Sequence, residues 1–195
     1  MDTHLYIIAG VSCSGKSTFI DQVLVPKILS AKSTSFTADD IAMTFAYRLA
    51  KTFNITKRPV TIVHYNSLHA FKNRPEMSVE ELRSDPLLKN LLNQPYKTTL
   101  YLCYVPEGKL YERVNNREFL EPQFYANNTR YNKELAKEKL QNVNQRKVLL
   151  DLADLFSSIT SDIHIVLSNE NKIDLLSLND FRYGLPTQSL EQKLK

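Results

Sequence analysis

The sequence is short of residues that crosslink a chain or carry it through a membrane. Only two cysteines, Cys13 and Cys103, occur in 195 residues, and tryptophan is absent. Two thiols cannot form the dense disulfide framework of a small secreted scaffold, so a reducing compartment is expected. No apolar run approaches the roughly 18 residues that a membrane-spanning helix needs. Residues 1–4 also lack the positive charges that begin a signal peptide. The sequence therefore predicts a cytoplasmic protein without membrane contact.

Neither sign of charge dominates the chain. It has 25 Lys and Arg against 21 Asp and Glu, a formal net charge of +4. This small positive net charge suits a protein that binds polyanionic ligands. The basic residues form no run, so nucleic-acid binding is neither implied nor excluded. Because 43% of the residues are hydrophobic, we expect one domain with a proper core over residues 1–185, followed by a polar tail over 186–195.

Apolar segments alternate with stretches of helical periodicity, which is typical of a parallel α/β sheet. The segment from Val60 to His64 is mostly β-branched, as in strands buried on both faces. The predicted strands are residues 4–9, 33–37, 60–64, 98–104 and 163–167. The predicted helices are residues 16–29, about 40–53, 107–119, 133–156 and a short one after the last strand. The sequence thus predicts an α/β fold with a five-stranded, mainly parallel sheet flanked by helices and a small lid.

Glycine is scarce, and two of the four glycines stand in one short motif. Residues Gly10 to Ser17 read G-V-S-C-S-G-K-S directly behind the first predicted strand, which is the phosphate-loop pattern G-x-x-x-x-G-K-[S/T] between a strand and a helix. We expect Gly15 to let backbone N–H groups approach a phosphate, Lys16 to reach the β- and γ-phosphates, and Ser17 to bind Mg²⁺. The predicted nucleotide-binding residues are Gly10, Ser12, Cys13, Ser14, Gly15, Lys16, Ser17 and Thr18. The alternative is an ordinary Gly/Ser turn.

Ligands of parallel α/β sheets bind beyond the carboxyl ends of the strands, so polar residues at those ends are candidate site residues. Asp39 and Asp40 follow the second predicted strand. A carboxylate can accept the proton of a hydroxyl that attacks a phosphate, so Asp39 is predicted to be a general base and Asp40 a substrate contact. The alternative is that either aspartate caps the helix that follows.

Further candidates follow the third and fourth predicted strands. Arg113 and Arg117 are four residues apart on one helix face, where guanidinium groups can meet charge on a transferred phosphoryl group. We predict that residues 107–132 form the lid that carries them, with Arg130 as a further phosphate or substrate contact. His64 and Asn66 are predicted substrate contacts. The alternatives are a solvated helix face for the arginines and a hydrogen-bonded strand-end histidine.

Together these features resemble the small P-loop kinases, most closely the kinases of polynucleotide 5′-hydroxyls and those of zeta-toxin type. The shared motifs are G-x-x-x-x-G-K-S-T at Gly10 to Thr18, D-D-I at Asp39 to Ile41, and L-x-x-R-x-x-x-R at Leu110 to Arg117. The resemblance implies a P-loop NTPase fold and transfer of the γ-phosphoryl group of ATP, with Mg²⁺, to a hydroxyl. It carries the role of base onto Asp39 and the role of lid arginines onto Arg113 and Arg117. The acceptor is a small molecule, a nucleotide or a polynucleotide end.

Two other interpretations stay open. Residues Asn171 to Asp174 read N-K-x-D, the guanine-reading motif of GTPases, which would make the protein a GTP-binding switch. No D-x-x-G accompanies this motif in the chain. The other alternative is a sulfotransferase-like or non-catalytic relative that binds a nucleotide without transferring a phosphoryl group.

Overall fold

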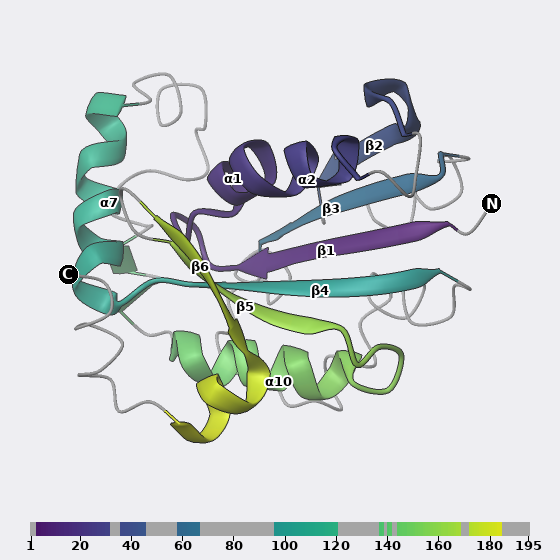
Figure 1. The fold of residues 1–195 in the computed structure, drawn as a ribbon. Coiled ribbons are helices and arrows are strands. Elements are labelled where there is room, and N and C mark those ends of the chain that lie inside the picture. The colour runs from purple at the N-terminus through teal and green to yellow at the C-terminus, as the bar shows by residue number, and fades with distance from the viewer. Residues whose placement is uncertain are drawn as a thin grey trace.

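A mixed sheet of six strands, in the order β2-β3-β1-β4-β5-β6, forms the centre of the molecule (Figure 1). The computed structural model describes residues 3–31, 36–45, 58–66, 96–120, 137–138, 140–141, 144–168 and 172–184. The strands are β1 His4–Gly10, β2 Ile41–Phe45, β3 Val60–Asn66, β4 Lys97–Tyr104, β5 Ile163–Ser168 and β6 Ile173–Ser177. The helices are α1 Lys16–Phe19, α2 Val25–Leu29, α7 Glu107–Leu120 and α10 Gln145–Phe156.

Strand β1 lies between β3 and β4 and runs parallel to both. Strands β2 and β5 extend the parallel part on either side, whereas β6 pairs antiparallel with β5. The carboxyl ends of β1, β3, β4 and β5 therefore meet at one edge of the sheet. Helix α7 stands across this edge, where the arrow of β1 ends in Figure 1.

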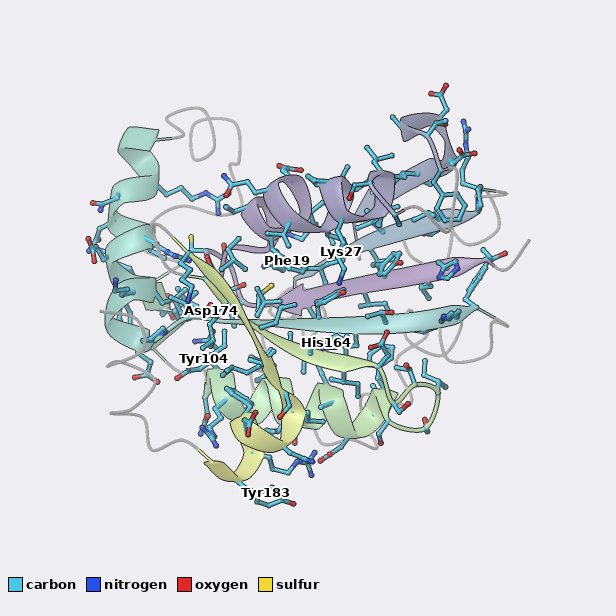
Figure 2. The ribbon with its side chains drawn as sticks, in the orientation of Figure 1. Phe19, Lys27, Tyr104, His164, Asp174 and Tyr183 are labelled. Carbon is cyan, nitrogen blue, oxygen red and sulfur yellow. The ribbon has the colours of Figure 1, made fainter. Side chains whose placement is uncertain are left out.

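The two faces of the sheet bury separate apolar clusters. Leu5 and Ile7 of β1 point into a cluster with residues of α7 and α10, while Ile8 points into one with Phe19 and other residues of the α1–α2 stretch. In Figure 2, Phe19 lies between its helix and the sheet, whereas Tyr183 lies at the surface, 80% exposed. Because side chains alternate between faces along a strand, a nearly continuous apolar strand such as β1 supplies both clusters.

The helix after β1 covers one face of the sheet and contains a widened turn. Helices α1 and α2 are joined by a π-helical turn, Ile20–Leu24, so the helical stretch runs without a break from Lys16 to Leu29, as predicted. Pro26 is the second residue of α2, just after the widened turn. A proline has no N–H to donate and its ring crowds the carbonyl four residues back, which explains why the turn widens there.

Three of the expected elements differ from the structure in the residues that it describes. Residues 36–37, the described part of the strand predicted at 33–37, are not in a strand, and the start of the helix predicted from about residue 40 is replaced by a short 3₁₀ turn, Ala38–Asp40, and by strand β2, Ile41–Phe45. Residues 32–35 and 46–57 lie outside the described residues. The short helix expected after the last strand is strand β6 followed by a π-helical turn, Asp180–Gly184. The sheet therefore has six strands instead of five, because both segments gain hydrogen-bonding partners that a local pattern does not reveal.

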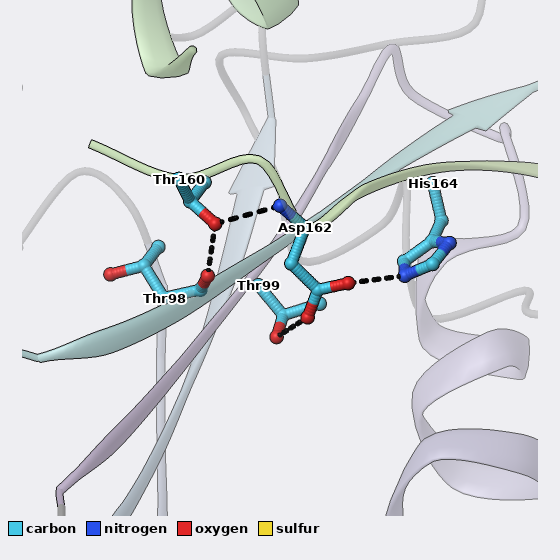
Figure 3. A network of polar contacts seen from close by, with 5 residues as sticks. All are labelled: Thr98, Thr99, Thr160, Asp162 and His164. Carbon is cyan, nitrogen blue, oxygen red and sulfur yellow. Dashed lines mark hydrogen bonds and ion pairs between the residues drawn. The ribbon is translucent and has the colours of Figure 1, made fainter. Parts of the chain in front are cut away.

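A network of polar side chains fixes β5 to β4 at the amino-terminal edge of the sheet (Figure 3). The Thr160 hydroxyl donates to the carbonyl of Thr98 at 2.6 Å and accepts the Asp162 N–H at 3.0 Å. The Asp162 carboxylate accepts from the Thr99 hydroxyl at 2.6 Å and contacts His164 Nε2 at 2.7 Å. Burial alone would raise the pKa of Asp162, but these hydrogen bonds lower it below its ordinary value. The network thus sets the register of the two strands.

Candidate functional site

The loop that follows β1 turns through two left-handed residues. Cys13 has φ 63° and Gly15 has φ 87°, and Ser14 between them is not in this region. Alternation of this kind makes successive backbone N–H groups converge into a concavity that binds anions. Helix α1 begins at Lys16, and no side chain caps its start. Backbone N–H groups of the loop and the positive end of the helix dipole thus lie at the carboxyl end of β1.

The two glycines of the loop are needed because protein atoms lie close to them. A Cβ at Gly15 would stand 2.6 Å from Ser168 Oγ and 2.8 Å from Ser168 Cβ, both at the end of β5. A Cβ at Gly10 would stand 2.7 Å from the Cys103 carbonyl. The sequence interpretation gave Gly15 the role of letting a phosphate approach. In the structure, the space that a Cβ would fill at Gly15 is taken by Ser168.

The Lys16 side chain folds back onto the loop. Its Nζ donates to the carbonyl of Gly10 at 3.0 Å and to that of Val11 at 2.6 Å, and the residue is buried. Burial lowers the pKa of Lys16 to about 8. Two residues away, the buried Ser14 hydroxyl has no hydrogen-bond partner among the residues that the structure describes. A lysine whose charge meets neutral carbonyls, and a hydroxyl with a free donor, are groups of the kind that bind an anion.

The hydroxyls of Ser17 and Thr18 belong to exposed residues in the first helical turn. Of the predicted set, Ser12 is buried and lies beside Cys13, with 3.9 Å between Ser12 Oγ and Cys13 Sγ. Exposed hydroxyls at a helix start are free to meet a phosphate or its metal ion. Among the residues that the structure describes, no three His, Cys, Asp or Glu gather into a metal site. The role of Ser17 as a ligand of Mg²⁺ stays a prediction.

Helix α7 brings both predicted arginines to the loop. Arg113 Nη2 donates to the Ser168 carbonyl at 2.9 Å and to its hydroxyl at 3.3 Å, and Nη1 makes a long 3.5 Å contact with the Cys13 carbonyl. Arg117 Nη1 lies 3.5 Å from Cys13 Sγ. The arginines therefore do not form a purely solvated face. The predicted closing motion of the lid stays a prediction, and residues 121–132, with Arg130, lie outside the described residues.

A buried glutamine fixes the corner from which α7 starts. The Gln145 amide, at the start of α10, donates to the Val105 carbonyl at 2.8 Å and accepts the Val105 N–H at 3.1 Å. Val105 lies between the end of β4 and the start of α7. Gln145 thus satisfies both backbone groups at the point where the chain leaves the sheet, and it fixes the direction of α7.

His64 lies near the loop, as predicted from the strand ends. It pairs in register with Ile8 of β1, two residues before Gly10. Burial lowers the pKa of His64 to about 4, and the charges of Lys16 and Arg117 add to this effect. His64 is therefore neutral at pH 7, in the positive field of both cations. The backbone of Asn66 is paired with Gly10 at the same edge, and its side chain lies outside the described part of the chain.

Asp39 and Asp40 lie at the opposite edge of the sheet. Both precede β2, whose first residue, Ile41, is in register with Val60 and so with His4 at the start of β1. The expected placement of the pair beside the loop is therefore wrong: the strand follows the aspartates instead of preceding them. Asp40 accepts the backbone N–H and the hydroxyl of Thr37, each at 2.8 Å. These bonds lower the pKa of Asp40 and form the capping box of the 3₁₀ turn Ala38–Asp40. The helix that the alternative interpretation expected an aspartate to cap is replaced by β2.

The sequence interpretation missed one residue of the site. Ser168, buried at the end of β5, contacts both Gly15 and Arg113. Its position at the carboxyl end of a predicted strand was the signal that pointed to it.

The N-K-x-D segment lies near the carboxyl end of β5, and two of its own residues form an ion pair. Asp174 lies within β6 opposite Leu167, and its carboxylate forms a 2.8 Å ion pair with Lys172. Asn171 lies outside the described residues.

No family model matches this chain, and no curated protein is similar to it. Within the described ranges, no helix has the length and apolarity that crossing a membrane requires.

Proposed function

We propose that this protein is an ATP-dependent phosphotransferase of the P-loop NTPase fold that moves the γ-phosphoryl group to a hydroxyl of a small molecule, a nucleotide or a polynucleotide end. The observation that carries the proposal is the state of Lys16. It is a buried cation held by two loop carbonyls, in a loop whose left-handed residues aim backbone N–H groups inward. A phosphate would give Lys16 a partner of opposite charge, and it would give the Ser14 hydroxyl the hydrogen-bond partner that it lacks among the described residues.

The surrounding residues suit a triphosphate better than a single anion. Arg113 and Arg117 reach the loop from α7, where both guanidinium groups contact Cys13, and the charge of Arg117 acts on Lys16. Several fixed donors around one point stabilise charge that develops on a transferred phosphoryl group. The Ser17 hydroxyl would bind the Mg²⁺ that accompanies the triphosphate, and that ion would neutralise part of the phosphate charge. His64, neutral at the end of β3, is proposed as an acceptor contact.

The proposal assigns no general base, because Asp39 lies at the other edge of the sheet. This placement favours a second candidate, a protein that binds the nucleotide without transferring its phosphoryl group. A cytoplasmic location accompanies either candidate, since ATP is available there and both cysteines of the chain are free.

Replacement of Lys16 by methionine tests the proposal. Methionine keeps an apolar stem of similar length in the buried site, so the fold should survive while the charge is lost. Radiolabelled ATP is offered with nucleosides, oligonucleotides, sugars and small alcohols, and ATP and GTP binding are measured separately. We expect Lys16→Met to lower transfer by about 10²-fold or more, the scale for a lost charge-stabilising donor. Lys27→Met, at an exposed lysine of α2, is the matched control.

The outcomes separate the candidates. Unchanged transfer in Lys16→Met would overturn the assignment of the loop. Triphosphate binding that depends on Lys16, without transfer to any acceptor, would support the second candidate. Absence of triphosphate binding by the unmodified protein would overturn both.

A further inference from the structure

We infer that Ser168 is a positioning residue that orients the Arg113 guanidinium on the phosphate loop. The inference rests on the proposed function, since the orientation matters when a phosphate occupies the loop. It assigns a role to a residue at the end of β5 that no loop or lid motif contains.

Arg113 contacts Ser168 through Nη2 and the loop through Nη1. Nη2 donates to two oxygens of the same residue, the Ser168 carbonyl at 2.9 Å and the Ser168 hydroxyl at 3.3 Å. Nη1 is directed to the loop, 3.5 Å from the Cys13 carbonyl and 3.4 Å from where a Gly15 Cβ would stand. A guanidinium group is planar, so two acceptors on one nitrogen fix the direction of the other.

Ser168 is itself fixed against the loop. It is buried, and its side chain occupies the space that a Cβ at Gly15 would need. The serine therefore contacts both groups whose relative position matters: the glycine that turns the loop and the arginine that faces it. A small side chain with a hydroxyl is required, because a larger one would press on Gly15 and an alanine would remove the hydroxyl that accepts from Nη2.

The chemical consequence is that Arg113 meets the phosphate already oriented. A donor that is held before the reaction costs no reorganisation when charge develops in the transition state. Loss of the hydroxyl should therefore slow transfer more than it weakens binding of the nucleotide. The backbone carbonyl of Ser168 remains in any variant, so the effect should be moderate.

Kinetics of Ser168→Ala test this role. We expect kcat to fall about 5- to 10-fold, the scale of one ordinary hydrogen bond, while KM for ATP changes less than about twofold. In an Arg113→Met background, Ser168→Ala should have no further effect, because the group it orients is gone. Ser30→Ala, which removes an exposed hydroxyl at the end of α2, is the control. Equal losses of Ser168→Ala in both backgrounds would overturn the inference.

A second measurement does not require catalysis. Nitrogen-15 NMR of the arginine side chains reports rotation about the Cζ–Nη bonds, which hydrogen bonds to Nη2 slow. We expect rotation at Arg113 to accelerate in Ser168→Ala, while rotation at Arg58, whose Nη1 donates to the Asp39 carbonyl away from the loop, stays unchanged. Unchanged rotation in that variant would overturn the inference, whatever the activity. If the unmodified protein neither binds nor transfers phosphate, the proposed function fails, and this measurement still decides whether Ser168 orients Arg113.

Discussion

At the scale of single residues, the phosphate loop depends on backbone conformations that few side chains tolerate. Cys13 is the one residue other than glycine, within the described ranges, that has positive φ. The Cys13 side chain also makes a contact, since its Sγ lies 3.5 Å from Arg117 Nη1. A left-handed residue with a Cβ carries strain of about 1–2 kcal/mol that the rest of the loop must offset.

This strain predicts an unusual order of stability at Cys13. Alanine and glycine both remove the Sγ contact, but only glycine relieves the left-handed strain. We expect Cys13→Gly to be more stable than Cys13→Ala by about 1 kcal/mol, measured by urea unfolding. At the exposed helical residue Asp21, the order should be reversed, because alanine is the better helix former. The same order at both positions would contradict the left-handed conformation of Cys13.

A second residue-scale prediction concerns pH. The pKa of His64 is lowered to about 4 against about 6.5 in an unfolded chain. Between these values the unfolded state binds more protons, so the folded state loses stability as pH falls from 6.5 to 4. The loss reaches at most about 3 kcal/mol. We expect the difference in unfolding free energy between the unmodified protein and His64→Gln to change by this order across the window. A constant difference would show that His64 titrates normally.

At the scale of elements, α7 is the part that brings two guanidinium groups to the loop after β1. Its direction is set at the corner after β4, where the Gln145 amide bonds both backbone groups of Val105. The helix then reaches the loop through Arg113 and Arg117. A fault at the corner should therefore affect both stability and the position of the arginines.

Gln145→Leu tests this corner. Leucine has a similar size but leaves the Val105 N–H and C=O buried without a partner, which should lower the free energy of unfolding by about 2–4 kcal/mol. Gln141→Leu, at an exposed glutamine, should change it by less than about 0.5 kcal/mol. Unfolding in urea measures both. A small effect at Gln145 would mean that water or another group replaces the amide.

At the scale of the whole molecule, sheet topology separates the two acidic candidates from the loop. Asp39 and Asp40 precede β2, whose start is in register with the start of β1. The loop begins six residues further along β1, which at about 3.3 Å per residue is roughly 20 Å.

This separation predicts a mild effect of Asp39→Asn. A surface substitution that far from the site should change turnover by about twofold or less. Asp40→Asn should likewise spare turnover but weaken the turn that Asp40 caps through Thr37. Turnover of both variants is compared with that of Arg113→Met, which should fall at least 10²-fold. A comparable loss in Asp39→Asn would show that this aspartate reaches the loop during the reaction.

The features that the sequence determined by itself are local. The helix over residues 16–29 and the strands β1, β3, β4 and β5 follow from short apolar patterns and from one motif, and the structure confirms them within two residues. The arrival of α7 arginines near the loop was also predictable, because α7 follows β4, the strand next to β1 in the parallel sheet.

Only the tertiary structure decided the features that depend on a distant partner. Residues 41–45 became a strand because β3 offers its edge to them, and residues 173–177 because β5 does. The first pairing moved Asp39 away from the loop. Packing of β5 on the loop brought Ser168 to Gly15 and Arg113, although Ser168 and Gly15 are 153 positions apart in the sequence. A strand edge or a buried contact is stabilised by the segment that pairs with it. That segment is distant in the sequence, so the local pattern does not identify it.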